Sequence, residues 1–268
     1  MAVVTIARTG GSGGEEIGKA VAQKLGYEYI GKNMILKGVE VRGEQWLEWG
    51  KQLDEHGPSP WERFDRSFTG FVSLVESCIY GFALENNKVI TGRGGNFLLK
   101  DVPFALRTYI TAPVEERIRR VSDREHVNME TARRMIGFSD HERSSYLHTV
   151  YHRDGADPED YDMVFNTGSL SVDEVARQIL DEIPAREKQA TPEAQEKLRQ
   201  LALAARIKAD ILTDFQVFIP TLEVVHDGEA IVIQGVAHSL KQQERVLEIA
   251  RRAAGTDRIR SLLNLRGA

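Results

Sequence analysis

The chain has 268 residues, of which 41% are hydrophobic and 28% charged, and its formal net charge is -5 at pH 7. This length allows one large domain and one small one, and the charge argues against a strongly basic surface, so no nucleic-acid partner is expected. The single cysteine, Cys78, excludes an intramolecular disulfide and a multi-cysteine zinc site. A signal-peptide leader and a run of about 18 apolar residues are both missing, so we expect a cytoplasmic protein without a transmembrane segment.

The beginning of the chain predicts a strand, a glycine-rich loop and a helix. Residues 3–7 are apolar and β-branched, residues 10–14 are four glycines and a serine, and a helical apolar pattern starts at Ile17. In such a turn, backbone NH groups surround a phosphate and the helix N-terminus adds partial positive charge. The residues expected to bind a nucleotide here are Gly11, Ser12, Gly13, Gly14 and Glu16. The alternative is a flexible surface loop.

Four further strands are expected, at residues 27–30, 89–91, 106–110 and 163–166. Long helical stretches separate them, which predicts an α/β fold with a parallel sheet and helices on both faces. The insert at residues 35–86 is helix-rich. Its longest helix is marked by apolar residues at helical spacing, namely Phe64, Phe68, Phe71, Val72, Val75, Ile79 and Phe82.

Two sequence pairs match the capping box, in which a hydroxyl and a carboxylate each satisfy a backbone NH at a helix start. The first is Ser139 with Glu142 and the second is Ser171 with Glu174. We therefore expect helices to begin near residues 140 and 172.

A domain boundary is predicted in the polar stretch at residues 184–189. The preceding helix is expected to end near Ile183, and Thr191 with Pro192 supplies a new N-cap followed by proline at the first helical position. We therefore predict domains at 1–186 and 191–268, joined by a linker at 187–190, and we expect the two to fold independently.

The second domain is predicted to be a small α+β unit. Its expected elements are a helix at 192–213, a strand at 222–226, a turn at Asp227-Gly228, a strand at 230–234, a helix at 240–254 and a strand at 259–265. The tight turn makes the first two strands an antiparallel hairpin.

The glycine loop departs from the usual P-loop pattern G-x-x-x-x-G-K-[ST]. With its last glycine at Gly14, Glu15 takes the lysine position and Glu16 the serine or threonine position. The stretch at 11–18, Gly-Ser-Gly-Gly-Glu-Glu-Ile-Gly, resembles the opening of the cytidylate kinase-like family, some of whose members carry a lysine-less G-S-G-G-R-E-I version. Glu15 is acidic where that version is basic, so the loop is less positive than the family norm.

The resemblance continues through the segments at 89–96, 112–120, 140–146 and 161–168, and it covers about residues 1–183. Gly31-Lys32 stands where family members often carry Asp-Arg. The resemblance implies a P-loop fold of the nucleoside monophosphate kinase type, with ATP as donor and a CMP-like acceptor. Mg²⁺ would accompany ATP, held mainly by phosphates and waters, and no protein metal ligand is predicted.

All basic residues from 113 to 153 are arginines, eight in number, with no lysine. Guanidinium groups recognise phosphate oxygens in a bidentate way. By resemblance this stretch is the lid, whose arginines stabilise the transferring phosphoryl group. We expect Arg120 and Arg124 to act there together with Arg93, which follows a strand end. The alternative for each is a surface ion pair.

Asp140 and Arg143 are three residues apart and share one helix face. The resemblance implies that Asp140 binds a sugar hydroxyl of the acceptor and Arg143 its phosphate, whereas spacing alone also allows an intrahelical ion pair. His148 and His152 are four apart, but no third ligand is evident, so no metal site is assigned to them.

The run at 224–236, followed by the predicted helix at 240–254, resembles the BON domain over about residues 191–268. That resemblance implies a protein or phospholipid partner. Eleven basic and ten acidic residues give this part little attraction for anionic lipid.

Two functions remain open from the sequence. One is an ATP-dependent nucleoside monophosphate kinase with an appended interaction domain. The other is a catalytically weak or inactive nucleotide-sensing module that signals through the BON-like domain.

Overall fold

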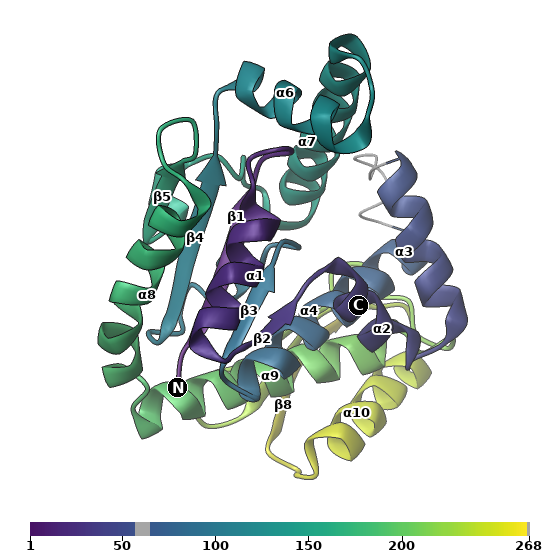
Figure 1. Ribbon diagram of the computed structural model, residues 1–268. Coiled ribbons are helices and arrows are strands. Elements are labelled where there is room, and N and C mark those ends of the chain that lie inside the picture. Colours follow the sequence, from purple (N-terminus) through teal and green to yellow (C-terminus); the bar gives the residue numbers. More distant parts are fainter. Residues whose placement is uncertain (57–64, 267–268) are drawn as a thin grey trace.

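A five-stranded parallel sheet forms the centre of the computed structural model, which describes residues 1–56 and 65–266 (Figure 1). The strand order is β2-β3-β1-β4-β5. The strands are β1 (Val3–Arg8), β2 (Glu28–Ile30), β3 (Lys88–Thr91), β4 (Ala105–Thr111) and β5 (Met163–Asn166). The predicted parallel α/β sheet is confirmed, and all five carboxyl ends point to one edge.

Helices cover both faces of this sheet because side chains alternate along each strand. Ile6 of β1 packs with Ile17 of α1 (Gly14–Leu25) and Ile179 of α8 (Val172–Lys188) on one face. Val3 packs on the other face, under α4 (Arg66–Leu84). The helices α2 (Lys32–Glu40), α3 (Glu44–His56) and α5 (Gly95–Leu98) complete that second layer. The position of Phe64, expected in the long helix, lies outside the described residues.

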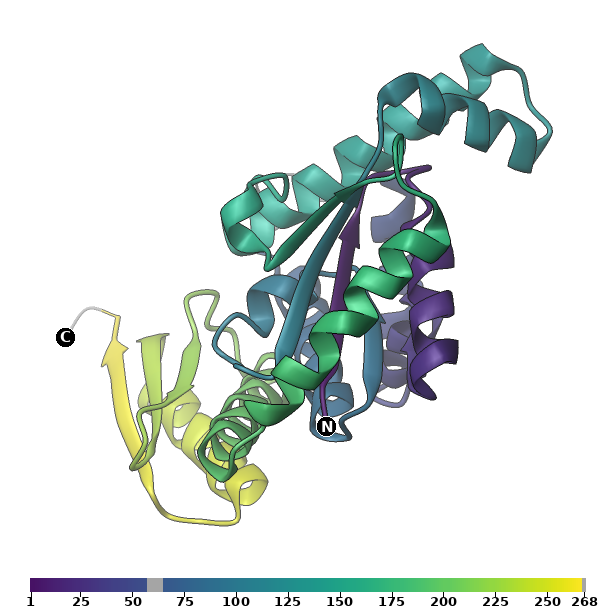
Figure 2. The same cartoon turned by 60° about the vertical axis from the view of Figure 1, so that its left-hand side comes forward.

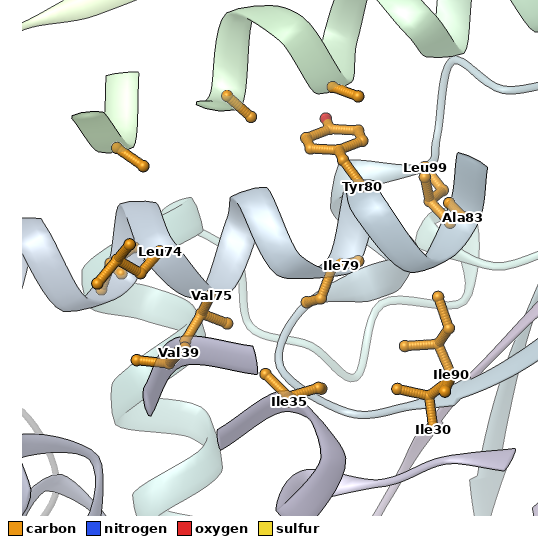
Figure 3. Packing of buried hydrophobic residues seen from close by; sticks show 14 of the residues in the cluster. Ile30, Ile35, Val39, Leu74, Val75, Ile79, Tyr80, Ala83, Ile90 and Leu99 are labelled. Atoms are coloured by element: carbon orange, nitrogen blue, oxygen red, sulfur yellow. The ribbon is translucent and has the colours of Figure 1, made fainter. Parts of the chain in front are cut away.

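The helix α4 is the centre of the second layer. Its window of highest hydropathy averages 1.4, and within the described residues it alone is long and apolar enough to cross a membrane. Figure 3 shows why it is so apolar: Val75 and Ile79 face Ile35 and Val39 of α2, while Tyr80 points toward the opposite side. The composition of α4 therefore fits a helix surrounded by core.

A helical hairpin projects beyond the carboxyl edge of the sheet (Figure 2). It consists of α6 (Val114–Glu125) and the first half of α7 (Met129–Tyr151), which pack through a small apolar cluster containing Ile118, Val121, Ala132 and Ile136. The prediction of a helix that begins near residue 140 is wrong. The helix α7 is continuous through Ser139, and its N-cap residue is Asn128. Packing of both halves of α7 overrides the local capping signal.

The helix α8 confirms the second capping box but runs further than predicted. Ser171 and Glu174 form both reciprocal hydrogen bonds of the box. The helix passes through Pro184 to Lys188 instead of ending near Ile183, so the first half of the predicted 187–190 linker is helical. Within the extension, Arg186 donates to the carbonyl of Ala105 at 3.4 Å and pairs with Asp162 at 3.4 Å, so tertiary contacts hold this turn.

The C-terminal part forms a second, three-stranded sheet in the order β6-β7-β8. Its elements are β6 (Glu223–His226), β7 (Ile231–Ala237), α10 (Leu240–Ala254) and β8 (Ile259–Leu265). The predicted antiparallel hairpin of β6 and β7 is confirmed, whereas β8 pairs parallel to β7.

One helix, α9 (Pro192–Leu212), belongs to two hydrophobic cores. Leu198 and Ala205 pack on α4 within the core of the first sheet, while Ile207 and Ile211 lie in the core of the C-terminal sheet. A cut near residue 190 would therefore uncover one side of α4. This arrangement argues against the expectation that the two parts fold independently.

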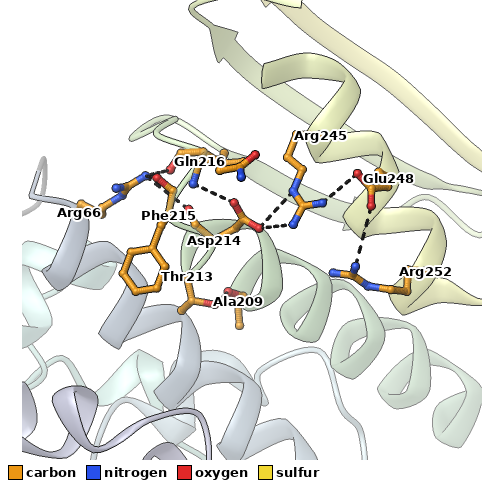
Figure 4. A network of polar contacts seen from close by, with 10 residues as sticks. Arg66, Ala209, Thr213, Asp214, Phe215, Gln216, Arg245, Glu248 and Arg252 are labelled. Carbon is orange, nitrogen blue, oxygen red and sulfur yellow. Dashed lines mark hydrogen bonds and ion pairs between the residues drawn. The ribbon is translucent and has the colours of Figure 1, made fainter. Parts of the chain in front are cut away.

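Polar contacts reinforce the same junction (Figure 4). Arg66, at the start of α4, donates to the carbonyl of Phe215 at 2.8 Å and to those of Asp214 and Val217. Arg245 of α10 pairs with the Asp214 carboxylate at 2.8 Å. The segment that follows α9 thus links α4 to the C-terminal sheet.

Candidate functional site

Two cavities meet at the carboxyl end of β1. The larger has a volume of about 410 Å³ and the smaller about 230 Å³. Four residues line both of them, namely Arg8, Thr9, Ser139 and Arg143. Ligands of open parallel sheets bind beyond the carboxyl ends of the strands, and this is where the two cavities lie.

The glycine loop forms one wall of the smaller cavity. Gly11 and Gly13 have φ of +76° and +82°, which L side chains rarely adopt. A Cβ on Gly14 would come within 2.7 Å of the Arg8 Cβ. The N-cap residue of α1 is Gly13, which has no side chain to cap the helix, so the first NH groups of α1 are available to an anion. The geometry supports the predicted roles of Gly11, Gly13 and Gly14.

Asp140 and Arg117 anchor the start of the loop from the helical hairpin. The Gly10 NH donates to the Asp140 carboxylate at 2.7 Å, and Arg117 donates to the Gly10 carbonyl at 3.1 Å while pairing with Asp140. Both Asp140 oxygens therefore accept hydrogen bonds within the protein. Arg143 lies 3.5 Å from Asp140, so the structure contains the intrahelical ion pair that the spacing allowed.

A second anchor holds the tip of the loop. Arg120 donates to the side chain of Thr167 at 2.8 Å and to its carbonyl at 2.7 Å, and it reaches the Ser12 carbonyl at 3.5 Å. The Thr167 hydroxyl also donates to the Ser12 carbonyl at 2.8 Å. The Ser12 hydroxyl bonds to the Thr9 carbonyl at 2.9 Å, so Ser12 contributes to the site through its backbone. The loop is thereby preorganised.

Arg120 does not occupy the place expected of a phosphoryl-contacting lid arginine, since it lines neither cavity. Its donors are directed to the loop backbone and Thr167 instead. The structure makes it a positioning residue. Arg124 does line the smaller cavity, but at the mouth, where it is 55% exposed and pairs with Glu125 at 2.8 Å.

We expect Arg120→Ala to weaken ATP binding at least about tenfold, because losing charge-assisted hydrogen bonds of about 1.5–3 kcal/mol releases the loop tip. Isothermal titration with ATP measures this, and Arg119→Ala is the matched control since Arg119 is exposed and pairs with Glu116 of its own helix. Lost turnover with unchanged ATP affinity would instead indicate direct contact with the transferring group.

The two acidic residues of the loop have different surroundings. Glu15 pairs with Lys19 at 2.7 Å, and that hydrogen bond lowers the pKa of Glu15. Glu16 lines the smaller cavity, and its carboxylate makes no hydrogen bond or ion pair with any residue that the structure describes. Glu16 is therefore the acidic group available to a ligand.

Three arginines gather where the cavities join. Burial, together with the positive charges of Arg143 and Arg93, lowers the pKa of Arg8 to about 10. Burial also lowers the pKa of Arg143, against the effect of Asp140. The guanidinium of Arg93 lies 5.6 Å from the centre of the Tyr146 ring. Such a cluster favours an anionic ligand.

Sequence reasoning missed Arg8, Arg117 and Thr167. Arg8 had a detectable signal, because a basic residue at the end of the first predicted strand must lie beside the glycine loop. The approach of Arg117 and Thr167 to the loop depends on tertiary packing of α6 and β5. No local pattern marks these two contacts.

The larger cavity mixes aromatic and polar groups. Tyr109, Phe138 and Tyr161 line it together with Lys32 and Arg93, and the rings of Tyr109 and Tyr161 stack with centres 4.9 Å apart. A few polar groups in an apolar wall are typical of small-molecule sites.

Three buried polar atoms of the cavity walls have no hydrogen-bond partner among the described residues, namely Thr9 Oγ1, Thr91 Oγ1 and Asn96 Nδ2. Buried polar groups are normally paired. These unpaired groups are additional evidence for a ligand site.

The parallel sheet, the glycine loop at its carboxyl edge and the arginine cluster define an α/β fold of the nucleotide kinase class. A family model for the cytidylate kinase-like family matches residues 3–169, and the chain belongs to this family. The match includes the glycine loop, the helical hairpin and Thr167. It ends before α9 and the C-terminal sheet, so the BON-like assignment stays a prediction.

Individual relatives agree with the family. The cytidylate kinase of Sulfurisphaera tokodaii is 26% identical over 176 residues, covering 65% of this chain and 91% of that protein. The cytidylate kinase of Ignicoccus hospitalis is 27% identical over 181 residues, covering 67% and 97%. A crystal structure of an uncharacterized protein from Eubacterium ventriosum shares the fold with a TM-score of 0.55 at 22% identity, covering 69% of this chain and 99% of that one.

Proposed function

We propose that this protein transfers the terminal phosphoryl group of ATP to the phosphate of a nucleoside monophosphate, with CMP as the first candidate. The observation that carries the proposal is the junction of two cavities at Arg8 and Arg143, beside the glycine loop. The smaller cavity suits the donor phosphates and the larger one an acceptor nucleotide.

In the proposed reaction an acceptor phosphate oxygen forms a bond to the γ-phosphorus of ATP. The bond from that phosphorus to the β,γ-bridging oxygen breaks, and its electron pair leaves with ADP. The acceptor phosphate is already ionised at neutral pH, since its second pKa is about 6, so no proton has to be removed. Catalysis then needs positioning and charge stabilisation.

The loop NH groups would bind the donor phosphates, and Arg143 and Arg93 would bind the acceptor phosphate. The aromatic wall of the larger cavity offers a stacking surface for a base. The predicted contact of Asp140 with a sugar hydroxyl stays a prediction. The matched relatives named cytidylate kinase support CMP as the acceptor.

The residues of the smaller cavity fit a magnesium ion that ATP brings with it. Within the described residues no group of three or more His, Cys, Asp or Glu could hold a metal, and Mg²⁺ in such sites takes one or two carboxylates plus phosphates. Glu16, whose carboxylate has no partner among the described residues, would hold it. The ion would neutralise charge on the phosphates.

We expect Glu16→Gln to raise the Mg²⁺ concentration for half-maximal activity about tenfold, because the amide removes an anionic ligand. The measurement is a Mg²⁺ titration of turnover at fixed ATP and CMP. Glu15→Gln is the matched control, since its carboxylate is paired with Lys19. An unchanged Mg²⁺ dependence in Glu16→Gln would contradict the assignment.

A coupled assay of ADP release with ATP, Mg²⁺ and a panel of nucleoside monophosphates tests the proposed function. We expect release to depend on the acceptor and to be fastest with CMP or a close analogue. ATP binding without acceptor-dependent release would favour the nucleotide-sensing alternative, for which the acidic Glu15 at the lysine position is the motivating feature.

A further inference from the structure

Arg8 occupies a position that two glycines make possible. It is the last residue of β1 and directly precedes the loop. Its side-chain stem lies against Gly14, where a Cβ would be 2.7 Å from the Arg8 Cβ, and a Cβ on Gly92 would overlap the Arg8 guanidinium. Arg8 therefore extends from the base of the loop to the end of β3, across the junction of the two cavities.

No carboxylate of the described residues lies within ion-pairing distance of Arg8. Tyr29 and, more weakly, Glu15 favour its charge. Arg143 and Arg93 oppose that charge. A half-buried cation beside two like charges lowers the stability of the fold. Such an arrangement is expected where an anion binds.

Among the residues that the structure describes, two basic ones, Arg8 and Arg143, line both cavities. The guanidinium of Arg143 lies 3.5 Å from the carboxylate of Asp140, which partly neutralises its positive charge. Arg8 thus borders both cavities without an ion pair to any described carboxylate, at the point where a group would pass from one cavity to the other. In the usual P-loop the lysine reaches the β- and γ-phosphates, and Glu15 holds that position here.

We propose that Arg8 supplies the cation missing from the glycine loop and that its guanidinium contacts the transferring phosphoryl group. This inference rests on the proposed kinase function. A guanidinium can bind two phosphate oxygens at once, and its charge would stabilise the loose transition state of phosphoryl transfer. Arg8 would then be a catalytic residue.

The test uses the full chain and its Arg8→Met and Arg8→Lys variants, with titration calorimetry for ATP and for ADP. If Arg8 contacts the terminal phosphate, Arg8→Met loses about 10- to 100-fold in ATP affinity while ADP affinity changes little. Turnover falls about 1000-fold or more, the range for a transition-state arginine. Arg8→Lys recovers part of the ATP affinity and part of the turnover, because it restores the charge but not the bidentate geometry.

A melting experiment without ligand separates this role from a structural one. The melting temperature of Arg8→Met should equal or exceed that of the wild-type protein, since the substitution removes like-charge repulsion. The control Arg134→Met alters an exposed arginine of α7 and should change none of these quantities. Equal losses of ATP and ADP affinity with a lower melting temperature would overturn the proposal, as would unchanged turnover in Arg8→Met.

Failure of the kinase proposal can be distinguished from failure of this one. If no nucleoside monophosphate accepts phosphate but Arg8→Met still abolishes the preference for ATP over ADP, Arg8 remains the terminal-phosphate ligand. If the unchanged protein is an active kinase and Arg8→Met is equally active, only the assignment of Arg8 is overturned.

Discussion

Gly13→Val is expected to reduce ATP affinity more than about 100-fold. Gly13 has φ of +82° at the N-terminus of α1, and the valine side chain would strain this backbone and enter the smaller cavity. The NH groups that bind phosphate would lose their common direction. Titration calorimetry with ATP measures the effect.

The matched control is Gly228→Val, which places the same side chain at another glycine of positive φ, +102°, in the distant β6–β7 turn. It should carry a similar folding penalty with ATP affinity intact. A folded Gly13→Val protein that binds ATP as well as the Gly228→Val variant would contradict the assignment of the loop.

Leu198→Ala is expected to lower the free energy of unfolding by about 2–5 kcal/mol, because it leaves a cavity between α9 and α4. Leu198 is only 2% exposed and belongs to the core of the first sheet. All three tryptophans lie at positions 46, 49 and 61. Urea unfolding followed by tryptophan fluorescence therefore reports on the first part of the chain. Leu198 itself lies beyond the predicted domain boundary.

If the two parts folded independently, Leu198→Ala would leave the tryptophan transition where it is. The structure predicts a clear shift to lower urea concentration. Leu240→Ala is the control, since Leu240 is 64% exposed at the start of α10. It should shift the transition little.

Local sequence signals predicted most of the elements correctly. The five strands of the first sheet lie where short apolar runs predict them, although only the four-residue helix α5 separates β3 from β4, and Thr191 caps α9 as expected. Errors arose where tertiary contacts override a local signal. Ser139 lies inside α7, because both halves of that helix pack against other elements. The helix α8 continues past Pro184, and Arg186 beyond it contacts β4 and Asp162.

The site was only partly predictable for a related reason. The glycine loop is contiguous in sequence, so its composition was sufficient to locate it. The roles of arginines depend on which partner each one reaches in space. Arg120 binds Thr167 and the loop tip rather than facing a cavity. The spacing of Arg120 and Arg124 carries no information about such partners.

Transfer of the labelled γ-phosphoryl group of ATP to CMP tests the central claim most directly. The 268-residue chain is incubated with γ-labelled ATP, Mg²⁺ and CMP, and the labelled products are separated. We expect labelled CDP, formed only when CMP and protein are both present and sharply reduced in Gly13→Val. Label that stays on ATP, or appears only as inorganic phosphate, with every nucleoside monophosphate tested would contradict it.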